Sequence, residues 1–196
     1  MPSLPTIARS SLDPPVINWK GRTRRFLNPG ELEVLIALIG GVKPRAVLEI
    51  GVNEGRTAAA ILEHMPGIDQ YVGVDVEPGY VTPLAVQRNE VPEQPGHLAA
   101  HDPRFHLMLR PNGSRDLSAF HLIEYDAVFI DGDHSRAGVE HDTKLARSVV
   151  RSPGIVIWHD YHSLGTVDVA DVLDEMAAAG ARIFHVSETW LAFERS

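Results

Sequence analysis

Short apolar runs and helically spaced apolar positions alternate along the chain from about residue 29 onward. Apolar runs predict strands at residues 46–50, 71–75, 105–109, 125–130, 154–158, 181–186 and 190–193. Helical spacing or composition predicts helices at residues 29–39, 56–65, 82–89, 137–150 and 167–179. This alternation predicts an α/β, Rossmann-like, doubly wound and mostly parallel sheet of seven strands, of which the last two form an antiparallel C-terminal hairpin.

The first predicted helix carries signals at both ends and sets the domain boundary. Asn28 can cap it, Pro29 suits its first turn, and Gly40-Gly41 end it. We therefore assign residues 29–196 to one domain and residues 1–28 to an N-terminal arm or lid, whose basic residues are Lys20, Arg22, Arg24 and Arg25. A solvated tail is the alternative for this arm.

Composition narrows the class of protein. The chain has 196 residues, 44% of them hydrophobic and 22% charged, which suits one globular domain. It has no cysteine, so disulfides and thiolate chemistry are excluded. A net charge of -8 argues against nucleic acid or anionic lipid as partner and favours a small neutral or cationic substrate. With no apolar run of signal-peptide or membrane-span length, we expect a cytoplasmic protein with no membrane partner.

A glycine-bearing turn, Glu49-Ile-Gly51-Val-Asn53-Glu-Gly55, joins a predicted strand to a predicted helix. Its spacing differs from the dinucleotide fingerprint G-x-G-x-x-G, and it has no P-loop Gly-Lys-Ser/Thr. Asp75 ends the next strand 24 residues after Gly51, where a carboxylate can accept hydrogen bonds from ribose hydroxyls. These features predict a nucleotide-type cofactor site, although a strand-ending turn and a helix cap are the structural alternative.

Two further aspartates follow strands that we expect to be neighbours. Asp131 comes after the run at 125–130 and Asp160 after the run at 154–158, so both reach the same edge of the sheet and can hold one hard cation. His134 lies one turn beyond Asp131 and can act as a general base. The stretch Asp131 to His134 also fits a turn followed by a helix cap. His159 is either a metal ligand or a neighbour that orients Asp160.

These motifs resemble class I S-adenosylmethionine-dependent methyltransferases. The turn matches their motif I, Glu-x-Gly-x-x-x-Gly, with Asn53 in place of the commoner middle glycine. The stretches Tyr125-Asp-Ala-Val-Phe-Ile-Asp131-Gly-Asp-His134 and Gly154-Ile-Val-Ile-Trp-His159-Asp160 are similar to the group of macrolide-sugar and rhamnosyl O-methyltransferases. The similarity runs from about Leu32 to the C-terminus.

The resemblance implies S-adenosylmethionine as cofactor, magnesium as metal and a role for each motif residue. The cofactor-binding residues it implies are Glu49, Gly51, Asn53, Gly55, Asp75, Ser114 and Asp131. The metal ligands it implies are Asp131 and Asp160. His159 stands where the sugar enzymes have a further carboxylate, which argues against an all-oxygen site, and we include it as a candidate ligand. His134 matches the proposed base.

We therefore expect metal-assisted O-methylation of a small hydroxylated acceptor such as a sugar, glycoside or phenol. A metal-independent methyltransferase and a noncatalytic cofactor-binding module are the alternatives, and a dehydrogenase is disfavoured by the glycine spacing. The domain leaves no room for a separate substrate domain, so acceptor contacts must come from loops, the arm or another subunit. We expect a homo-oligomer, most simply a dimer.

Overall fold

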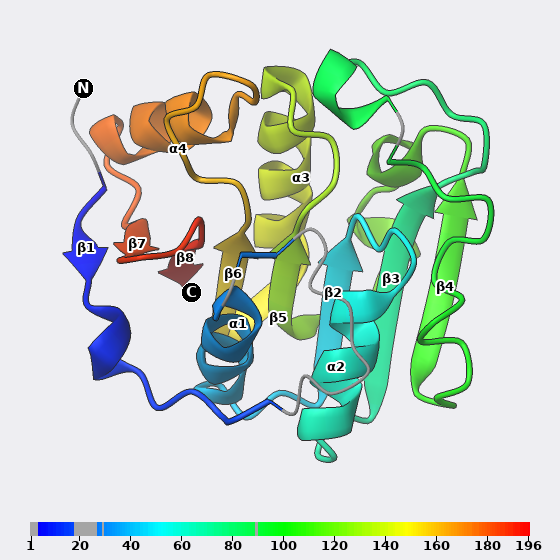
Figure 1. Ribbon diagram of the computed structural model, residues 1–196, viewed down its shortest axis with the longest axis horizontal. Helices are drawn as coiled ribbons and strands as arrows, with labels where there is room; N and C mark the ends of the chain where they lie inside the picture. Colours follow the sequence, from blue (N-terminus) through cyan, green and yellow to red (C-terminus); the bar gives the residue numbers. More distant parts are fainter. Residues whose placement is uncertain (1–3, 18–26, 29, 89) are drawn as a thin grey trace.

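The computed structural model describes residues 4–17, 27–28, 30–88 and 90–196. Within these residues, eight strands form one sheet in the order β1-β7-β8-β6-β5-β2-β3-β4 (Figure 1). The strands are β1 Thr6–Ile7, β2 Ala46–Ile50, β3 Gln70–Val76, β4 Phe105–Arg110, β5 Tyr125–Ile130, β6 Val150–Trp158, β7 Phe184–Val186 and β8 Ala192–Arg195. Strand β8 runs antiparallel to β6 and β7, and the other neighbouring pairs are parallel.

Four helices cover the two faces of the sheet in the described part of the chain. They are α1 Glu31–Gly40, α2 Arg56–His64, α3 Arg136–Val149 and α4 Val169–Ala178. Successive side chains of β5 point to opposite faces: Ala127 and Phe129 pack in the core with α1 and α2, whereas Val128 and Ile130 pack with α3 and α4. The central strand is therefore apolar throughout because it is buried on both sides.

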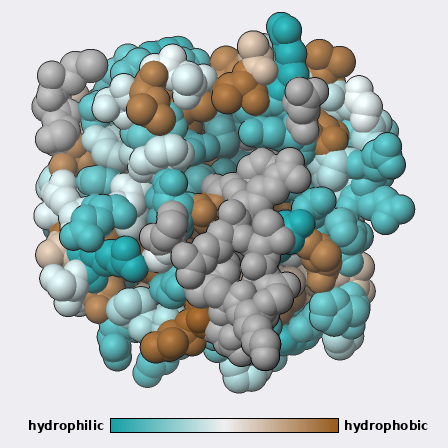
Figure 2. Space-filling model, in the orientation of Figure 1, coloured by the Kyte–Doolittle hydropathy of each residue, from teal (hydrophilic) through white to brown (hydrophobic). Residues whose placement is uncertain are grey.

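On the face drawn in Figure 2, apolar residues form small groups between polar ones. None of the helices in the described ranges combines the length and the apolar character that crossing a membrane requires.

The Rossmann-like fold class is confirmed, with one strand more than the seven predicted. The additional strand is β1, which lies in the proposed arm and adds to the edge of the sheet by pairing in parallel with β7. Leu4 beside it is 3% exposed, so this part of the arm contributes to the core. The basic positions 20–25 and Pro29 lie outside the described residues.

Two local predictions were wrong. Of the helix predicted at 82–89, the described residues form only a short 3-10 turn at Ala85–Gln87, because the buried Gln87 side chain bonds across to a distant turn. Helix α1 is preceded by Gly30 in the N-cap position, with φ of 85°, rather than by Asn28. The Asn28 backbone N–H instead donates to the Glu31 carboxylate at 2.6 Å.

The strand order reverses between β2 and β5, and this reversal positions the site. From β2 the chain continues to β3 and β4 on one side, whereas β5 and β6 lie on the other. The strand ends that carry Gly51 and Asp131 are adjacent, and the Asp131 N–H donates to the Ile50 carbonyl at 2.8 Å. Ligands of doubly wound sheets bind at such a switch point, beyond the carboxyl ends of the strands.

Candidate functional site

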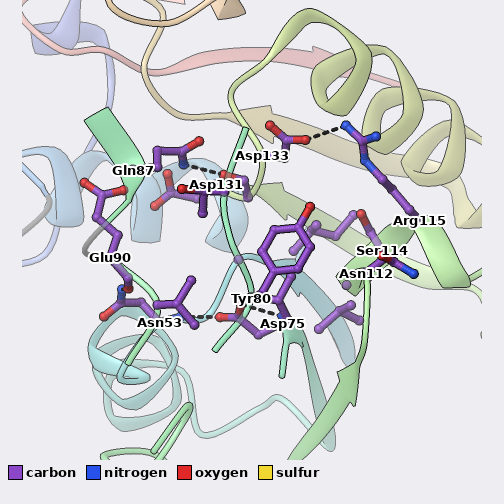
Figure 3. A pocket seen from close by; sticks show the side chains of 18 of the residues that line it. Asn53, Asp75, Tyr80, Gln87, Glu90, Asn112, Ser114, Arg115, Asp131 and Asp133 are labelled. Carbon is purple, nitrogen blue, oxygen red and sulfur yellow. Dashed lines mark hydrogen bonds and ion pairs between the residues drawn. The ribbon is translucent and has the colours of Figure 1, made fainter. Parts of the chain in front are cut away.

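A first pocket opens at the carboxyl ends of β2, β3 and β5. Figure 3 shows its polar wall, which comprises Asn53, Asp75, Tyr80, Gln87, Glu90, Asn112, Ser114, Arg115, Asp131 and Asp133. Of the predicted cofactor residues, the structure brings five together around this pocket, namely Gly51, Asn53, Asp75, Ser114 and Asp131. Glu49 and Gly55 are not among the lining residues.

Asp75 ties the glycine turn to the end of β3. Its Oδ2 accepts hydrogen bonds from the backbone N–H groups of Val52 at 2.9 Å and Asn53 at 2.6 Å, and its Oδ1 accepts from Val76 N–H at 2.7 Å. Burial raises the pKa of Asp75, although these hydrogen bonds oppose the shift. Because each carboxylate oxygen has two lone pairs, Oδ1 keeps one for a ligand in the pocket.

The glycines of the turn are required by contacts within the protein. Gly51 has φ of 89°, and a Cβ there would overlap the backbone carbonyl of Asp131. Gly55 has φ of 88° at the N-cap of α2, and a Cβ there would lie 3.0 Å from the Gly96 carbonyl oxygen. Side chains are therefore excluded at both positions before any ligand is considered.

Glu49 lies inside the sheet rather than in the pocket. It is 1% exposed, and its Oε2 accepts a hydrogen bond from the Tyr71 hydroxyl at 3.0 Å. Burial raises the pKa of Glu49 well above its ordinary value. This places the Glu49 carboxyl behind the glycine turn.

Ser114 is anchored by a buried carboxyl group. Its hydroxyl donates to Asp142 Oδ1 at 2.5 Å, and Asp142 Oδ2 forms no hydrogen bond within the described residues. Burial raises the pKa of Asp142 to about 7. Nearby, Arg115 forms an ion pair with Asp133 at 2.5 Å, so the Asp133 carboxylate is already paired.

A second pocket lies beside the first and contains the predicted metal and base residues. Asp131, His134 and Asp160 each offer a ligand atom, and these atoms all lie within 4.8 Å of one another. His134 Nδ1 is 3.0 Å from Asp160 Oδ2, and its Nε2 is 3.3 Å from Asp131 Oδ1. Burial opposes protonation of His134, but its interaction with Asp131 outweighs this effect and raises the pKa of the ring.

His159 stands behind this cluster and joins it to a buried glutamate. Its Nδ1 is 3.3 Å from Asp131 Oδ1 and 3.5 Å from Asp160 Oδ1, and its Nε2 is 3.1 Å from Glu31 Oε2. Burial lowers the pKa of His159, but the negative charge of Asp131 and the interactions with Asp160 and Glu31 together outweigh burial and raise the pKa well above its ordinary value. Burial raises the pKa of Asp131, but the interactions with His159 and His134 lower it to about 2.

Two residues that contact the site, Glu31 and Gln87, belong to no recognisable sequence motif. Glu31 begins α1 and contacts His159, which lies 128 residues away. Gln87 donates to the Gly132 carbonyl at 2.8 Å and accepts from the His134 N–H at 3.2 Å, so its amide holds the turn that carries Asp131 and His134.

The two pockets are adjacent and share one wall. Their shared lining residues are Gly51, Asn53, Gln87, Glu90 and Asp131. The second pocket alone adds the His134, His159 and Asp160 cluster, together with Trp190 and His162, whose rings lie 4.2 Å apart between centroids. An elongated ligand bound along this wall would have one end at Asp75 and the other at the carboxylate and imidazole cluster.

A family model identifies the family of this chain, and solved structures show its fold. The family model described as a methyltransferase domain matches residues 48–161. The fold is similar to a putative O-methyltransferase from Klebsiella pneumoniae, at 18% identity over 87% of this chain and 80% of that chain, with a TM-score of 0.56. A search of curated protein sequences finds no match.

Two further solved structures show the same fold. A putative caffeoyl-CoA O-methyltransferase from Staphylococcus aureus is 14% identical over 92% of this chain and 84% of that chain, with a TM-score of 0.59. The O-methyltransferase TomG from Streptomyces achromogenes, solved in complex with SAM, is 15% identical over 85% and 78%, with a TM-score of 0.57. At these identities the similarity establishes the fold.

The collision at Gly51 leads to a stability prediction with a matched control. Gly51 and Gly79 have nearly equal φ values of 89° and 91°, but a Cβ at Gly79 would meet nothing within 4 Å. Both alanine substitutions carry backbone strain, and only Gly51→Ala adds a clash with Asp131. We expect Gly51→Ala to lower the free energy of unfolding by about 1–3 kcal/mol more than Gly79→Ala, measured by urea denaturation. Equal losses would contradict the packing role.

The raised pKa of Asp142 predicts a pH-dependent stability. The pKa is about 7 in the folded chain and 3.8 in an unperturbed aspartate, so between these values the unfolded chain ionises while the folded chain keeps the proton. The wild type should therefore lose stability as pH rises toward 7. Asp142→Asn cannot ionise and should gain about 2–3 kcal/mol relative to the wild type between pH 5 and pH 8, measured by urea denaturation. A pH-independent difference would refute this assignment.

Proposed function

The chain belongs to the methyltransferase domain family and is an S-adenosylmethionine-dependent methyltransferase, and we propose that it methylates a hydroxyl oxygen of a small acceptor with the help of a divalent cation. One observation carries the proposal. The pocket that contains Asp75 shares Gly51 and Asp131 with a second pocket, which contains the Asp131, His134, His159 and Asp160 cluster.

The first pocket suits the adenosine half of the cofactor. Asp75 Oδ1 can accept a hydrogen bond from a ribose hydroxyl, and Ser114 lies across the pocket from it, where the adenine ring would lie (Figure 3). Asn53 and Gly51 then lead toward the second pocket, which would take the sulfonium end. The cofactor-binding set we propose is Gly51, Asn53, Asp75, Ser114 and Asp131, with Glu49 and Gly55 supporting the turn from behind.

The donor atoms of the second pocket fit a divalent cation. Asp131 and Asp160 supply carboxylate oxygens, and His159 Nδ1 faces both of them. His134 Nε2 has no hydrogen-bond partner within the described residues, and we leave it outside this ligand set as the base. Such a mixed oxygen and nitrogen set is typical of divalent metal sites. A bound cation would act as a Lewis acid that lowers the pKa of the acceptor hydroxyl.

His134 is the proton acceptor in this proposal. Its Nδ1 is directed at Asp160, which orients the ring and leaves Nε2 to take the proton from the acceptor hydroxyl. The hydroxyl oxygen then forms a bond to the methyl carbon as the carbon–sulfur bond breaks, and the electron pair of that bond neutralises the sulfonium. Gln87 keeps His134 in place through the backbone on either side of Asp133.

The remaining wall of the second pocket favours an acceptor that combines a ring with hydroxyl groups. Trp190, Leu164 and Val86 provide apolar surface, and Leu164 and Val86 are 65% and 51% exposed. A sugar, glycoside or phenol has such a flat apolar face beside polar groups. Since Leu164 and Val86 are exposed apolar side chains at this wall, we also propose that a second copy of the chain covers them in a dimer.

A metal-independent methyltransferase is the second candidate, and one observation favours it. Glu31, Asp131 and Asp160 surround His159 with negative charge, so a protonated His159 could take the place of a cation. His134 would then act as base without a Lewis acid. Turnover in the presence of chelator separates the two candidates.

The ribose contact can be tested by calorimetry with S-adenosylhomocysteine. Asp75→Ala removes the proposed acceptor for the ribose and the tether of the glycine turn, so we expect binding to weaken by about 1–3 kcal/mol. Glu77→Ala is the control, because it removes an exposed carboxylate two residues further along. Equal affinities in the wild type and a folded Asp75→Ala variant would refute this cofactor assignment.

Variants of the proposed cation ligand and of the proposed base should lose activity in different ways. Asp160→Ala should abolish turnover that depends on added divalent cation while S-adenosylhomocysteine affinity stays nearly intact, because the cation serves the acceptor. His134→Ala should keep the cofactor and lose roughly 100- to 10,000-fold in rate, the range of a general base. The readout is turnover on a panel of hydroxylated acceptors with and without chelator.

Asp69→Asn is the control for these variants, because Asp69 is an exposed aspartate that precedes β3, at the opposite end of the strand from Asp75. Full turnover in excess chelator would reject the cation and leave the metal-independent candidate. A wild-type rate in His134→Ala on the same acceptor would reject His134 as the base.

A further inference from the structure

Glu31 is a fully buried carboxylate that lies behind the proposed cation site. It begins α1, is 0% exposed, and is surrounded by hydrogen-bond donors. Its Oε2 accepts from the Asn28 N–H at 2.6 Å, and its Oε1 accepts from the Trp190 N–H at 2.5 Å and from Asn28 Nδ2 at 3.2 Å. Because these partners are all N–H donors, both Glu31 oxygens act as hydrogen-bond acceptors.

This acceptor determines which nitrogen of His159 carries hydrogen. His159 Nε2 lies 3.1 Å from Glu31 Oε2, so Nε2 must donate. In the neutral ring, Nδ1 then has a free lone pair, and it faces Asp131 Oδ1 at 3.3 Å and Asp160 Oδ1 at 3.5 Å. A cation held between these three atoms would take the place of a proton on Nδ1, because a ligating nitrogen must be deprotonated.

We propose that Glu31 is a positioning residue that holds His159 as a nitrogen ligand of the cation site, and that this ligand makes the site prefer first-row transition ions such as Mn²⁺, Co²⁺ or Zn²⁺ to Mg²⁺. The inference rests on the proposed function only in requiring that a cation binds. Imidazole nitrogen suits transition ions, whereas Mg²⁺ selects oxygen ligands. A carboxylate that accepts from the second nitrogen of a ligating histidine fixes the ring and increases its donor strength.

The competing explanation is that Glu31 serves only the start of α1. Its contact with the Asn28 N–H resembles a helix capping interaction, and loss of that contact would destabilise the helix without any effect on metal. The two explanations differ in one respect. If Glu31 only caps the helix, the effect of replacing it does not depend on whether His159 is present. A double-mutant cycle between Glu31 and His159 therefore separates them.

The test measures binding of Mn²⁺ and Mg²⁺ alone to the full chain saturated with S-adenosylhomocysteine, by calorimetry. We expect the wild type to bind Mn²⁺ at least 10-fold more tightly than Mg²⁺. Glu31→Gln retains the shape of the side chain but offers an amide where His159 needs an acceptor, and it should weaken Mn²⁺ binding about 10- to 100-fold with little change for S-adenosylhomocysteine. Asp171→Asn, an acidic residue in the first turn of α4, is the control for helix effects.

The cycle and a spectroscopic measurement complete the design. In a His159→Ala background, Glu31→Gln should have no further effect on Mn²⁺ affinity. Pulsed electron paramagnetic resonance of bound Mn²⁺ should show a nitrogen coupling that persists in His134→Ala and disappears in His159→Ala, which tests the ligand even if Glu31→Gln fails to fold.

The outcomes also separate this inference from the proposed function. Equal wild-type affinities for Mn²⁺ and Mg²⁺, an unaltered Mn²⁺ affinity in Glu31→Gln, or no His159-dependent nitrogen coupling would overturn the inference and leave cation-assisted transfer intact. Absence of binding by either ion, together with full turnover in chelator, would overturn both.

Discussion

Direct backbone contact between the turn after β2 and the turn after β5 is the constraint on which the site depends. Gly51 has no side chain, which lets the Asp131 carbonyl approach, and the Asp131 N–H bonds to Ile50 at the same point. This contact brings the glycine turn and the Asp131 turn together at the switch point of the sheet. Gly51 and Asp131 are therefore both part of the wall that the two pockets share.

The parts of the fold that could be predicted are those that short-range patterns determine. Strand β5 was predicted at its observed bounds, Tyr125–Ile130, because a strand buried on both faces is a continuous apolar run between polar neighbours. The positions of Asp131 and Asp160 followed from the strand ends in the same way. Gln87 and Glu31 could not be found like this, because their partners His134 and His159 are 47 and 128 residues away and no local period reports such contacts.

The wrong predictions arose where tertiary contacts override local preference. The stretch 82–89 has helical composition, yet in the described residues the buried Gln87 amide is bonded to Gly132 and His134, and only a 3-10 turn forms around it. Likewise, Thr6 and Ile7 lie in a Pro-rich segment without a strand pattern, and they become β1 because the edge of β7 offers unpaired backbone groups. The environment, rather than the segment itself, determines both structures.

Charge balance links the carboxylates of the site to its imidazoles. Glu31, Asp131 and Asp160 all lie close to His159, but Glu31 is fully buried and lines neither pocket. The His159 ring and two backbone N–H donors already compensate Glu31 from behind, so the negative charge that faces the pockets is that of Asp131 and Asp160. Under the proposed function a divalent cation would offset these two charges. Asp131 lines both pockets, so it is the carboxylate that the cofactor side and the cation side of the site have in common.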